Sequence, residues 1–471
     1  MTERMSARAA ITAVTGPAAF TELPAPEEPA GRSSGPDGPL GWEGYDASRA
    51  RAAERTGESE SVVCGTGRIG TTDAVLISFE FGFLGGSLGE RTGDRLEAAY
   101  IHAREEGLPV VSLIATGGSR MQEGMRALLQ LQRVARQSAL TRAAGLPQLA
   151  VVRDPTAGGG WATLGAGADI VLALPGAQIG FAGSRVRPPD ADPYAYTAEA
   201  QLAAGHIDAV VRQDELRATV GRWLTLLTRG TRDGAGPVQP PDGLGGAGLP
   251  ATGWDAVLRT RSPERPHAGA YLDAYFSRRE SISGDRCGGT DPGMLCGFGL
   301  REGRTVAYAA QLGTATLPAG YRTAARLIRL ADRLGIPVLT LVDTPGAAND
   351  AEAERAGAGS AIADLFAAVA TARVPITSLL IGEGGSGGAL ALSAPGNTWA
   401  TNDSYFSVIA PELATAILKR TPDQTRSTAD QLRLRPQDLL SLGVVRGIVP
   451  GPAQQGVDER SRPAPPDRPS R

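Results

Sequence analysis

Glycine is the residue type in this chain whose placement could support catalysis. It recurs in four turns, at residues 116–119, 157–160, 345–346 and 384–388. Each turn follows an apolar run typical of a buried strand, so its backbone N–H groups are presented at a strand end. Glycine lets such groups approach a ligand without a Cβ in the way, and a following helix adds positive potential. Two N–H groups aimed at a thioester oxygen form an oxyanion hole, each donor contributing about 2.7–4 kcal/mol in the transition state.

Side chains able to act as acids or bases are scarce. Schiff-base chemistry would have to use Lys419, the single lysine. The run 384–388 contains the G-x-S-x-G pattern of a nucleophile elbow, but a hydrolase of that class needs a histidine after the serine. The histidines are His102, His206 and His267, and all of them precede Ser386. We therefore disfavour a Ser-His-Asp hydrolase and expect Ser386 to cap a helix.

The glycine turns belong to an internal repeat. Residues 108–118 recur as 336–346, and residues 146–160 recur as 374–388, both at an offset of 228 (336 minus 108). Two matched segments at one spacing predict two copies of one fold. Glycines could also serve only tight strand–helix packing. Because both sets recur with their repeat partners, we favour a functional role.

Alternating elements surround the turns in each copy. Helices are predicted over 95–106 and 323–334, and each is stopped by a glycine. Continuously apolar strands follow over 110–114 and 338–342, as expected for strands covered on both faces. This order of strand and helix indicates an α/β fold.

A second glycine pattern, at residues 65–70, matches G-x-G-x-x-G. A dinucleotide-binding fingerprint needs a helix after it, whereas residues 71–79 are β-branched and apolar. We therefore predict a strand–turn–strand hairpin here.

Length and composition suggest two domains. A chain of 471 residues exceeds one hydrophobic core, and the repeat places domains at 41–228 and 254–450. Residues 229–253 are rich in Gly, Pro, Asp and Ala and are predicted to form a flexible linker. The ends, 1–40 and 451–471, are expected to be disordered tails.

Composition also excludes several classes of function. The net charge is −3 with mixed signs, so no basic stripe points to nucleic acid. The three cysteines form no C-x2-C pair, so no structural metal site is expected. No run of 18 apolar residues could span a membrane. We expect a reduced, cytoplasmic protein.

Four motifs carry a resemblance to a known family: TGGSRMQE at 116–123, IGFAGSR at 179–185, DTPGA at 343–347 and GEGGSGGA at 382–389. At these residues the chain resembles the carboxyltransferase component of bacterial acetyl-CoA carboxylase, with its β and α subunits fused in that order. The resemblance implies an α/β fold of two tandem crotonase-type (ClpP/crotonase-like) domains with ββα repeats. It also implies an active site where a β-like domain meets an α-like domain.

The family's chemistry suits a site poor in side-chain bases. In this family, carboxybiotin on a separate carrier protein loses CO2, and the biotin ureido anion takes the α-proton of acetyl-CoA. The enolate captures CO2 to form malonyl-CoA, for fatty acid or polyketide synthesis. Oxyanions develop on the thioester and on the ureido group, which calls for two oxyanion holes.

Matching the family's motifs to this chain predicts the residues of the active site. The resemblance assigns Gly158 and Gly159 as catalytic, with Gly117 and Gly118 lining the same pocket in the β-like half. In the α-like half it assigns Gly387 and Gly388 as catalytic, with Gly346 beside them. Arg120 and Arg185 are candidates for binding coenzyme A phosphates or for fixing the loops. Which hole takes the thioester stays open.

The resemblance also predicts protein partners, and the chain departs from the family pattern at two places. The resemblance implies a biotin carboxylase, a biotin carboxyl carrier protein and a homodimer of this chain. The family's four-cysteine zinc ribbon is missing, so no zinc is expected, and Ala348-Asn349-Asp350 replaces the family's Tyr-Pro-Gly. This altered loop, near the family's biotin side, keeps two alternatives open. One is a biotin-independent malonyl-thioester decarboxylase, and the other is a non-catalytic assembly subunit.

Overall fold

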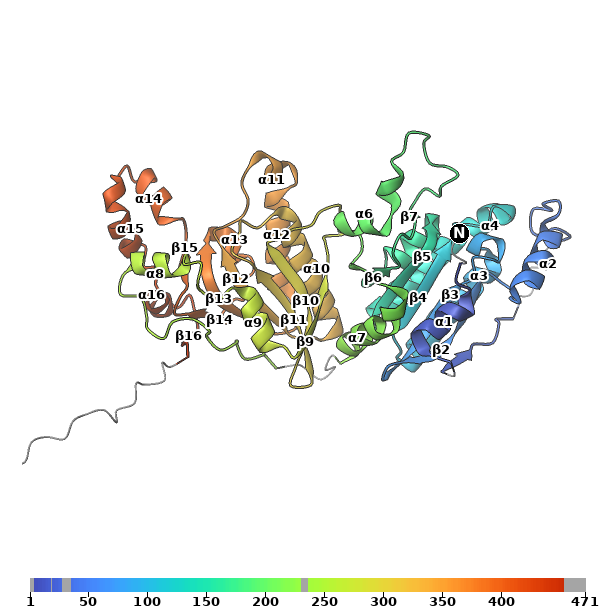
Figure 1. Ribbon diagram of the computed structural model, residues 1–471, viewed down its shortest axis with the longest axis horizontal. Helices are drawn as coiled ribbons and strands as arrows, with labels where there is room; N and C mark the ends of the chain where they lie inside the picture. The colour runs from blue at the N-terminus through green and yellow to red at the C-terminus, as the bar shows by residue number, and fades with distance from the viewer. Residues whose placement is uncertain (1–3, 18, 28–34, 230–235, 453–471) are drawn as a thin grey trace, which may run out of the picture.

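The computed structural model describes residues 4–17, 19–27, 35–229 and 236–452. Two similar halves lie side by side along its long axis, as Figure 1 shows. Each half is built on one mixed sheet of eight strands among the described residues. No helix in these described ranges is long and apolar enough to cross a lipid bilayer.

The first sheet has the order β1-β2-β3-β4-β5-β6-β8, with β7 paired to β5. Its strands are β1 (Phe20–Glu22), β2 (Val62–Ile69), β3 (Thr72–Phe79), β4 (Val110–Thr116), β5 (Gln148–Ala157), β6 (Ile170–Ala173), β7 (Ile179–Gly180) and β8 (Ala209–Val210). The pairs β1–β2 and β2–β3 are antiparallel, and the remaining pairs are parallel. The β2–β3 pair is the hairpin predicted at residues 65–70, which confirms that prediction.

Helices cover both faces of this sheet. On one face α3 (Glu90–Glu106) packs beside α4 (Gly124–Ala143), and on the other α1 (Ala7–Thr15) packs beside α7 (Leu216–Thr228). The remaining helices of this half are α2 (Tyr45–Thr56), α5 (Gly158–Gly160) and α6 (Ala198–Ala203). The largely apolar β4 is buried along its whole length, as its composition predicted.

The second sheet has the order β16-β14-β13-β12-β11-β10-β9, with β15 paired to β13. Its strands are β9 (Arg278–Ile282), β10 (Met294–Arg301), β11 (Arg304–Gln311), β12 (Val338–Thr344), β13 (Ile376–Gly385), β14 (Thr398–Thr401), β15 (Tyr405–Ser407) and β16 (Gly447–Val449). Its helices are α8 (Gly253–Thr260), α9 (Ala268–Tyr275), α10 (Pro318–Leu334), α11 (Ala351–Arg355), α12 (Ala358–Thr371), α13 (Ser386–Leu390), α14 (Pro411–Ile417), α15 (Thr425–Gln431) and α16 (Pro436–Ser441). α10 packs against α12 on one face, while α9 covers the other.

The repeat read from the sequence is a structural repeat. α10, β12 and β13 begin 228 residues after α3, β4 and β5 (318 minus 90), and both helices end at a glycine with φ near 66°. The leading hairpin is offset by 232 instead (294 minus 62), because the connection from hairpin to helix is four residues longer in the first half. That longer connection, residues 80–89, lies beside the first glycine turn.

The N-terminal segment differs from the disordered tail that was predicted over 1–40. Helix α1 buries Ile11 and Val14 in the core, and β1 extends the sheet by pairing with β2. In the second half, α9 and β9 occupy the matching places, so the repeat begins earlier than sequence matching indicated. The prediction was wrong because Pro and Gly flank the helix without interrupting its apolar face.

The connection between the halves also differs from prediction. A flexible linker was expected over 229–253, but residues 236–253 run along the second half. Val238 is buried, its carbonyl accepts a hydrogen bond from Thr377 Oγ1 at 2.8 Å, and Gln437 Nε2 donates to the Pro250 carbonyl at 2.7 Å. Residues 230–235 and most of the predicted tail 451–471, from residue 453 on, lie outside the described residues.

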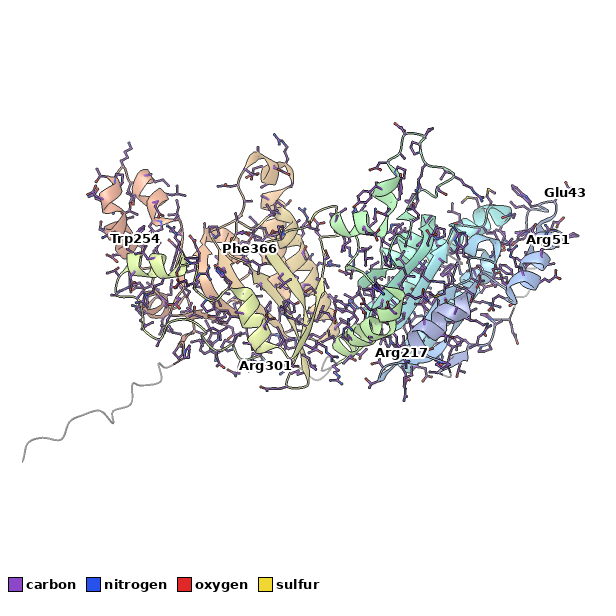
Figure 2. All side chains as sticks on the ribbon, in the orientation of Figure 1. Glu43, Arg51, Arg217, Trp254, Arg301 and Phe366 are labelled. Atoms are coloured by element: carbon purple, nitrogen blue, oxygen red, sulfur yellow. The ribbon has the colours of Figure 1, made fainter. Side chains whose placement is uncertain are left out.

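Apolar and charged contacts join the two halves. Trp223 on α7 meets Phe298 on β10 edge to face, with ring centroids 6.3 Å apart. Beside them the buried Asp208 carboxylate of the first half binds Arg286 and Arg326 of the second. Figure 2 labels Arg217 on α7 and Arg301 on β10, the two elements that carry Trp223 and Phe298.

Candidate functional site

The carboxyl ends of β4 and β5 carry the two glycine turns of the first half. Gly117 and Gly118 follow β4, and β5 runs directly into Gly158 and α5. Gly118 has a φ of 107° and Gly158 a φ of 64°. A Cβ on Gly158 would lie 3.1 Å from the Gly118 Cα, so the two turns meet backbone to backbone, which only glycine permits.

The second half repeats this arrangement at the ends of β12 and β13. Gly346 has a φ of 141°, and a Cβ on Gly385 would lie 1.9 Å from the Pro345 carbonyl oxygen. A Cβ on Gly388 would lie 2.4 Å from the Ala347 nitrogen. The structure therefore brings Gly346 together with the Gly387–Gly388 turn, as it brings Gly118 together with Gly158.

Several of the predicted glycines use their N–H groups inside the protein. Gly117 donates to the Gly85 carbonyl at 2.9 Å, and Gly158 donates to the Phe181 carbonyl at 3.0 Å. Gly118 and Gly346 each donate to a threonine two residues earlier, at 3.1 Å. These four glycines shape the turns.

The N–H groups left to face a ligand come from the short helices after the turns. Gly159 lies in the first turn of α5, and Gly387 and Gly388 lie in the first turn of α13. First-turn N–H groups have no carbonyl partner within their own helix. Gly159, Gly387 and Gly388 are therefore the candidate oxyanion donors.

Ser386 adopts a backbone conformation that serine rarely takes. Its φ is 56°, and its repeat partner Gly158 has a φ of 64°, so both halves impose the same left-handed residue before the helix. The prediction that Ser386 caps α13 was wrong. The cap is Gly385, without a side-chain hydrogen bond, and Ser386 is the first helical residue.

The two candidate holes differ in their surroundings. A Cβ on Gly159 would lie 2.3 Å from Leu131 Cδ1, so a leucine of α4 covers this position. A Cβ on Gly387 would meet no described atom within 4 Å. The second hole is therefore open where the first is backed by an apolar side chain.

A buried carboxylate supports the second hole, and sequence reasoning missed its role. Asp343 is fully buried at the end of β12, and both of its oxygens lie 2.7 Å from Arg265 Nη2. The Glu383 N–H on β13 also donates to it, at 3.1 Å. Asp343 thereby ties together the two strands that lead into the glycine turns. An aspartate next to the end of a largely apolar strand was the available signal.

Tyr321 supports the same turn from the other face of the sheet. Its hydroxyl donates to the Gly388 carbonyl at 3.2 Å. Burial raises the pKa of Tyr321 to about 12, so it remains a donor at neutral pH.

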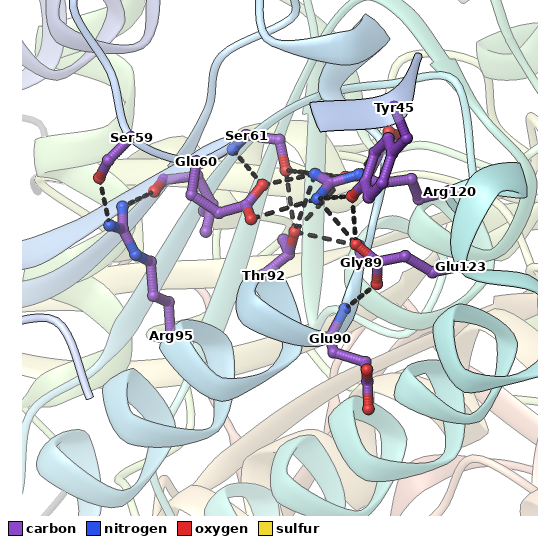
Figure 3. A network of polar contacts seen from close by, with 12 residues as sticks. Tyr45, Ser59, Glu60, Ser61, Gly89, Glu90, Thr92, Arg95, Arg120 and Glu123 are labelled. Atoms are coloured by element: carbon purple, nitrogen blue, oxygen red, sulfur yellow. Dashed lines mark hydrogen bonds and ion pairs between the residues drawn. The ribbon is translucent and has the colours of Figure 1, made fainter. Parts of the chain in front are cut away.

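The two predicted arginines lie in different environments. Arg120, two residues after Gly118, is only 1% exposed and lies in the network of polar contacts in Figure 3. Arg185 lies exposed in the loop after β7. The contacts of Arg120 favour the loop-fixing role among the two alternatives for it, whereas Arg185 is available to a ligand.

Figure 1 places α13 in the second half and β7, which pairs with the end of β5, in the first, with α10 and α12 between them. Within one chain the two pairs of glycine turns are therefore apart. Across the ranges that the structure describes, no group of three or more His, Cys, Asp or Glu side chains could hold a metal ion.

Two family models match the chain. One is described as a carboxyl transferase domain and matches residues 42–223, and the other, described as acetyl co-enzyme A carboxylase carboxyltransferase-like, matches residues 250–463.

Curated relatives match across both halves. A protein of Saccharopolyspora erythraea named acetyl-coenzyme A carboxylase carboxyl transferase subunits beta/alpha is 40% identical, over 87% of this chain and 75% of its own length. A protein of the same name from Clostridium tetani is 32% identical, over 87% of this chain and 74% of its own. A Mycobacterium bovis protein, named probable biotin-dependent acyl-coenzyme A carboxylase beta3 subunit, is 34% identical, over 86% of this chain and 83% of its own length.

Solved structures show the same fold. A transcarboxylase 12S structure has a TM-score of 0.75 at 20% identity, covering 95% of this chain and 87% of its own. A single-chain, multi-domain long-chain acyl-CoA carboxylase has a TM-score of 0.71 at 20% identity, and the match covers 95% of this chain and 46% of that protein's chain. These similarities confirm the predicted α/β fold of two tandem crotonase-type domains.

Proposed function

The chain belongs to the acyl-CoA carboxylase carboxyltransferase family, and from this premise we propose that it transfers a carboxyl group from carboxybiotin to acetyl-CoA, giving malonyl-CoA. The observation that carries the proposal is the duplicated pair of glycine turns, one at each sheet's carboxyl edge. The reaction develops negative charge on two oxygens, and the chain offers two sets of main-chain donors. Malonyl-CoA made in this way would supply fatty acid or polyketide synthesis.

The donors act by stabilising charge that is absent in the ground state. We assign the N–H of Gly159 to one oxyanion and those of Gly387 and Gly388 to the other, with Gly117, Gly118, Gly158 and Gly346 shaping the turns. Removing one such donor typically lowers turnover 10²- to 10³-fold. Because the donors are fixed by the fold, they require no reorganisation when the charge appears.

Carboxybiotin, delivered by a biotin carboxyl carrier protein after loading by a biotin carboxylase, supplies the carboxyl group. The second hole suits such a bulky group because no described atom lies within 4 Å of a Cβ on Gly387. Asp343 and Tyr321 hold the turn from both sides of the sheet, so the hole is open towards the ligand and rigid behind it. Exposed Arg185 is our candidate for a coenzyme A phosphate.

A homodimer would bring the two kinds of turn together. We propose that the first domain, 41–228 with the N-terminal segment added, faces the second domain, 254–450, of another copy. Large apolar side chains are exposed beside both pairs of turns, namely Met121, Met125, Phe181 and Val186 in the first half and Val408, Leu413 and Ile417 in the second. Exposed apolar patches of this kind are typical of surfaces that are covered by a partner.

One assay tests the proposed function. Purified chain is given malonyl-CoA with and without a biotinylated carrier, and acetyl-CoA release is followed. Release that requires the carrier supports the proposal. Release without biotin would instead support the malonyl-thioester decarboxylase that the altered 348–350 loop keeps open. If folded, dimeric protein releases no acetyl-CoA, the result would support the non-catalytic assembly subunit. In the forward direction, with a carboxylated carrier as the donor, propionyl-CoA as a competing acceptor tests the choice of acetyl-CoA.

A further inference from the structure

Arg120, two residues after Gly118 of the first glycine turn, is the centre of the buried charge cluster drawn in Figure 3. Its guanidinium binds the carboxylate of Glu60 and lies 3.2 Å from Glu123 Oε1. Tyr45, brought in by α2, lies 3.3 Å from Arg120 Nη1 and donates its hydroxyl to Glu123. Arg120, Glu60, Glu123 and Tyr45 are all buried.

The cluster also binds the segment 80–89, which lies beside the first glycine turn. Arg120 Nη2 donates to the Ser87 carbonyl at 2.8 Å, and Arg120 Nε donates to Ser87 Oγ at 3.2 Å. The next residue, Leu88, donates its N–H to the Gly118 carbonyl at 2.9 Å and accepts from the Arg120 N–H at 2.8 Å. Side chain and main chain of Arg120 therefore hold both the turn and its support.

The charges in the cluster are stable at neutral pH. Although burial alone would raise it, the charge of Arg120 holds the pKa of Glu60 below its usual value. Burial raises the pKa of Tyr45, so its hydroxyl stays protonated and donates. The guanidinium therefore keeps a permanent anionic partner.

The second half builds the same turn without any of these charges. The two backbone bonds recur 228 residues later, from Thr316 N–H to the Gly346 carbonyl at 3.0 Å and from Ala348 N–H to the Thr316 carbonyl at 2.9 Å. The residue matching Arg120 is Ala348, which packs against Ala353 and Ala358. The turn therefore forms without a guanidinium at this position, and apolar packing in place of a buried ion pair is often neutral or stabilising.

We propose that Arg120, held by Glu60 and Glu123, is a positioning residue that fixes the Gly117–Gly118 turn against the Gly158–Gly159 turn during carboxyl transfer. The inference rests on the proposed function and deepens it. The first oxyanion hole has this charged clamp, whereas the second half has Ala348 at the matching position and holds its turn through Asp343 and Tyr321. A rigid hole keeps the Gly159 donor aimed at the developing charge and not at the ground-state carbonyl.

The test compares variants that differ in what they remove. R120K keeps a charge but loses the fork that reaches Glu60, Glu123 and Ser87 together. R120M/E60Q removes both charges of the shortest pair, while Glu123 keeps its hydrogen bonds from the Tyr45 hydroxyl and the Glu90 N–H. R133M is the matched control, because Arg133 on α4 joins partly buried ion pairs with Asp94 and Glu97 on α3 of the same domain and makes none with Glu60 or Glu123.

Two readouts separate positioning from folding and from substrate binding. We expect R120K and R120M/E60Q to lower kcat at least 30-fold with KM for malonyl-CoA within threefold, whereas R133M keeps the wild-type kcat. Hydrogen exchange at the amides of residues 117–120 should rise at least tenfold in both variants. It should stay unchanged in R133M.

Other outcomes would overturn the inference. A raised KM for malonyl-CoA, absent with an N-acetylcysteamine thioester that lacks the nucleotide, would make Arg120 a phosphate-binding residue. A normal kcat per folded molecule, or unchanged exchange at 117–120, would make the cluster structural only. Inactive wild-type protein with the expected exchange pattern would refute the proposed function while leaving Arg120 as the clamp of the turn.

Discussion

Gly387 offers the most direct test of the glycine-built site, because its substitution should harm the reaction and spare the fold. A Cβ on Gly387 meets no described atom within 4 Å, and its φ is not in the left-handed region. In a helix, glycine is about 0.8–1.0 kcal/mol less favourable than alanine, so Gly387→Ala should be neutral or slightly stabilising. Any loss of turnover must then come from the new methyl group meeting the substrate.

The expected loss follows from the value of one donor, because a side chain at position 387 would hold the substrate oxygen away from the main-chain N–H. An oxyanion-hole donor contributes about 2.7–4 kcal/mol, which corresponds to a rate factor of roughly 100 to 900. We expect Gly387→Val to lower kcat at least 100-fold, with Gly387→Ala in between. The assay is carrier-dependent acetyl-CoA release, measured together with the melting temperature.

Two other glycines provide matched controls. Gly359, in the first turn of α12, also has open space at its Cβ position, so Gly359→Ala should keep both stability and turnover. Gly388 is the opposite case, since its Cβ would meet the Ala347 nitrogen at 2.4 Å, and Gly388→Ala should unfold the turn. The reasoning is refuted if Gly387→Val retains more than a third of wild-type turnover, or if it loses activity only in proportion to lost folded protein.

Three further predictions concern the first hole, the N-terminal helix and the junction. Gly159→Ala should lower the free energy of unfolding by about 1–3 kcal/mol through its contact with Leu131. In a Leu131→Ala background the same substitution should cost less stability but still abolish turnover; recovered turnover would contradict this. Ile11→Ala should lower the free energy of unfolding, measured with urea, by about 2–5 kcal/mol, because Ile11 is 3% exposed. A decrease below about 0.5 kcal/mol would mean that α1 is not part of the core. Arg286 and Arg326 hold the pKa of Asp208 below 3.8 despite its burial, so its stabilisation is present above about pH 3.8 and is lost as the pH falls through the lowered value. Asp208→Asn should therefore melt earlier than wild type at pH 7, with a difference that shrinks in acid; a constant difference from pH 7 to pH 3 would contradict this.

The repeat and its strands could be predicted from sequence because they depend on local patterns. Apolar runs over 110–114 and 338–342 are strands, each preceded by a helix that ends at glycine. The boundaries moved by a few residues, since helices α3 and α10 begin earlier, at Glu90 and Pro318. The N-terminal segment was missed, because its helix gains its stability from contacts with strands far along the chain.

The amino-acid sequence by itself determined that glycine would stand at the end of four buried strands, since chain order and residue type place it there. Only the tertiary structure decided which amides remain for a ligand, because a hydrogen bond such as Gly158 to Phe181 joins residues that no local pattern connects. It also decided that Arg120 faces inward. A charged side chain can be buried only where partners from separate elements, here Glu60 and Glu123, converge to replace its water.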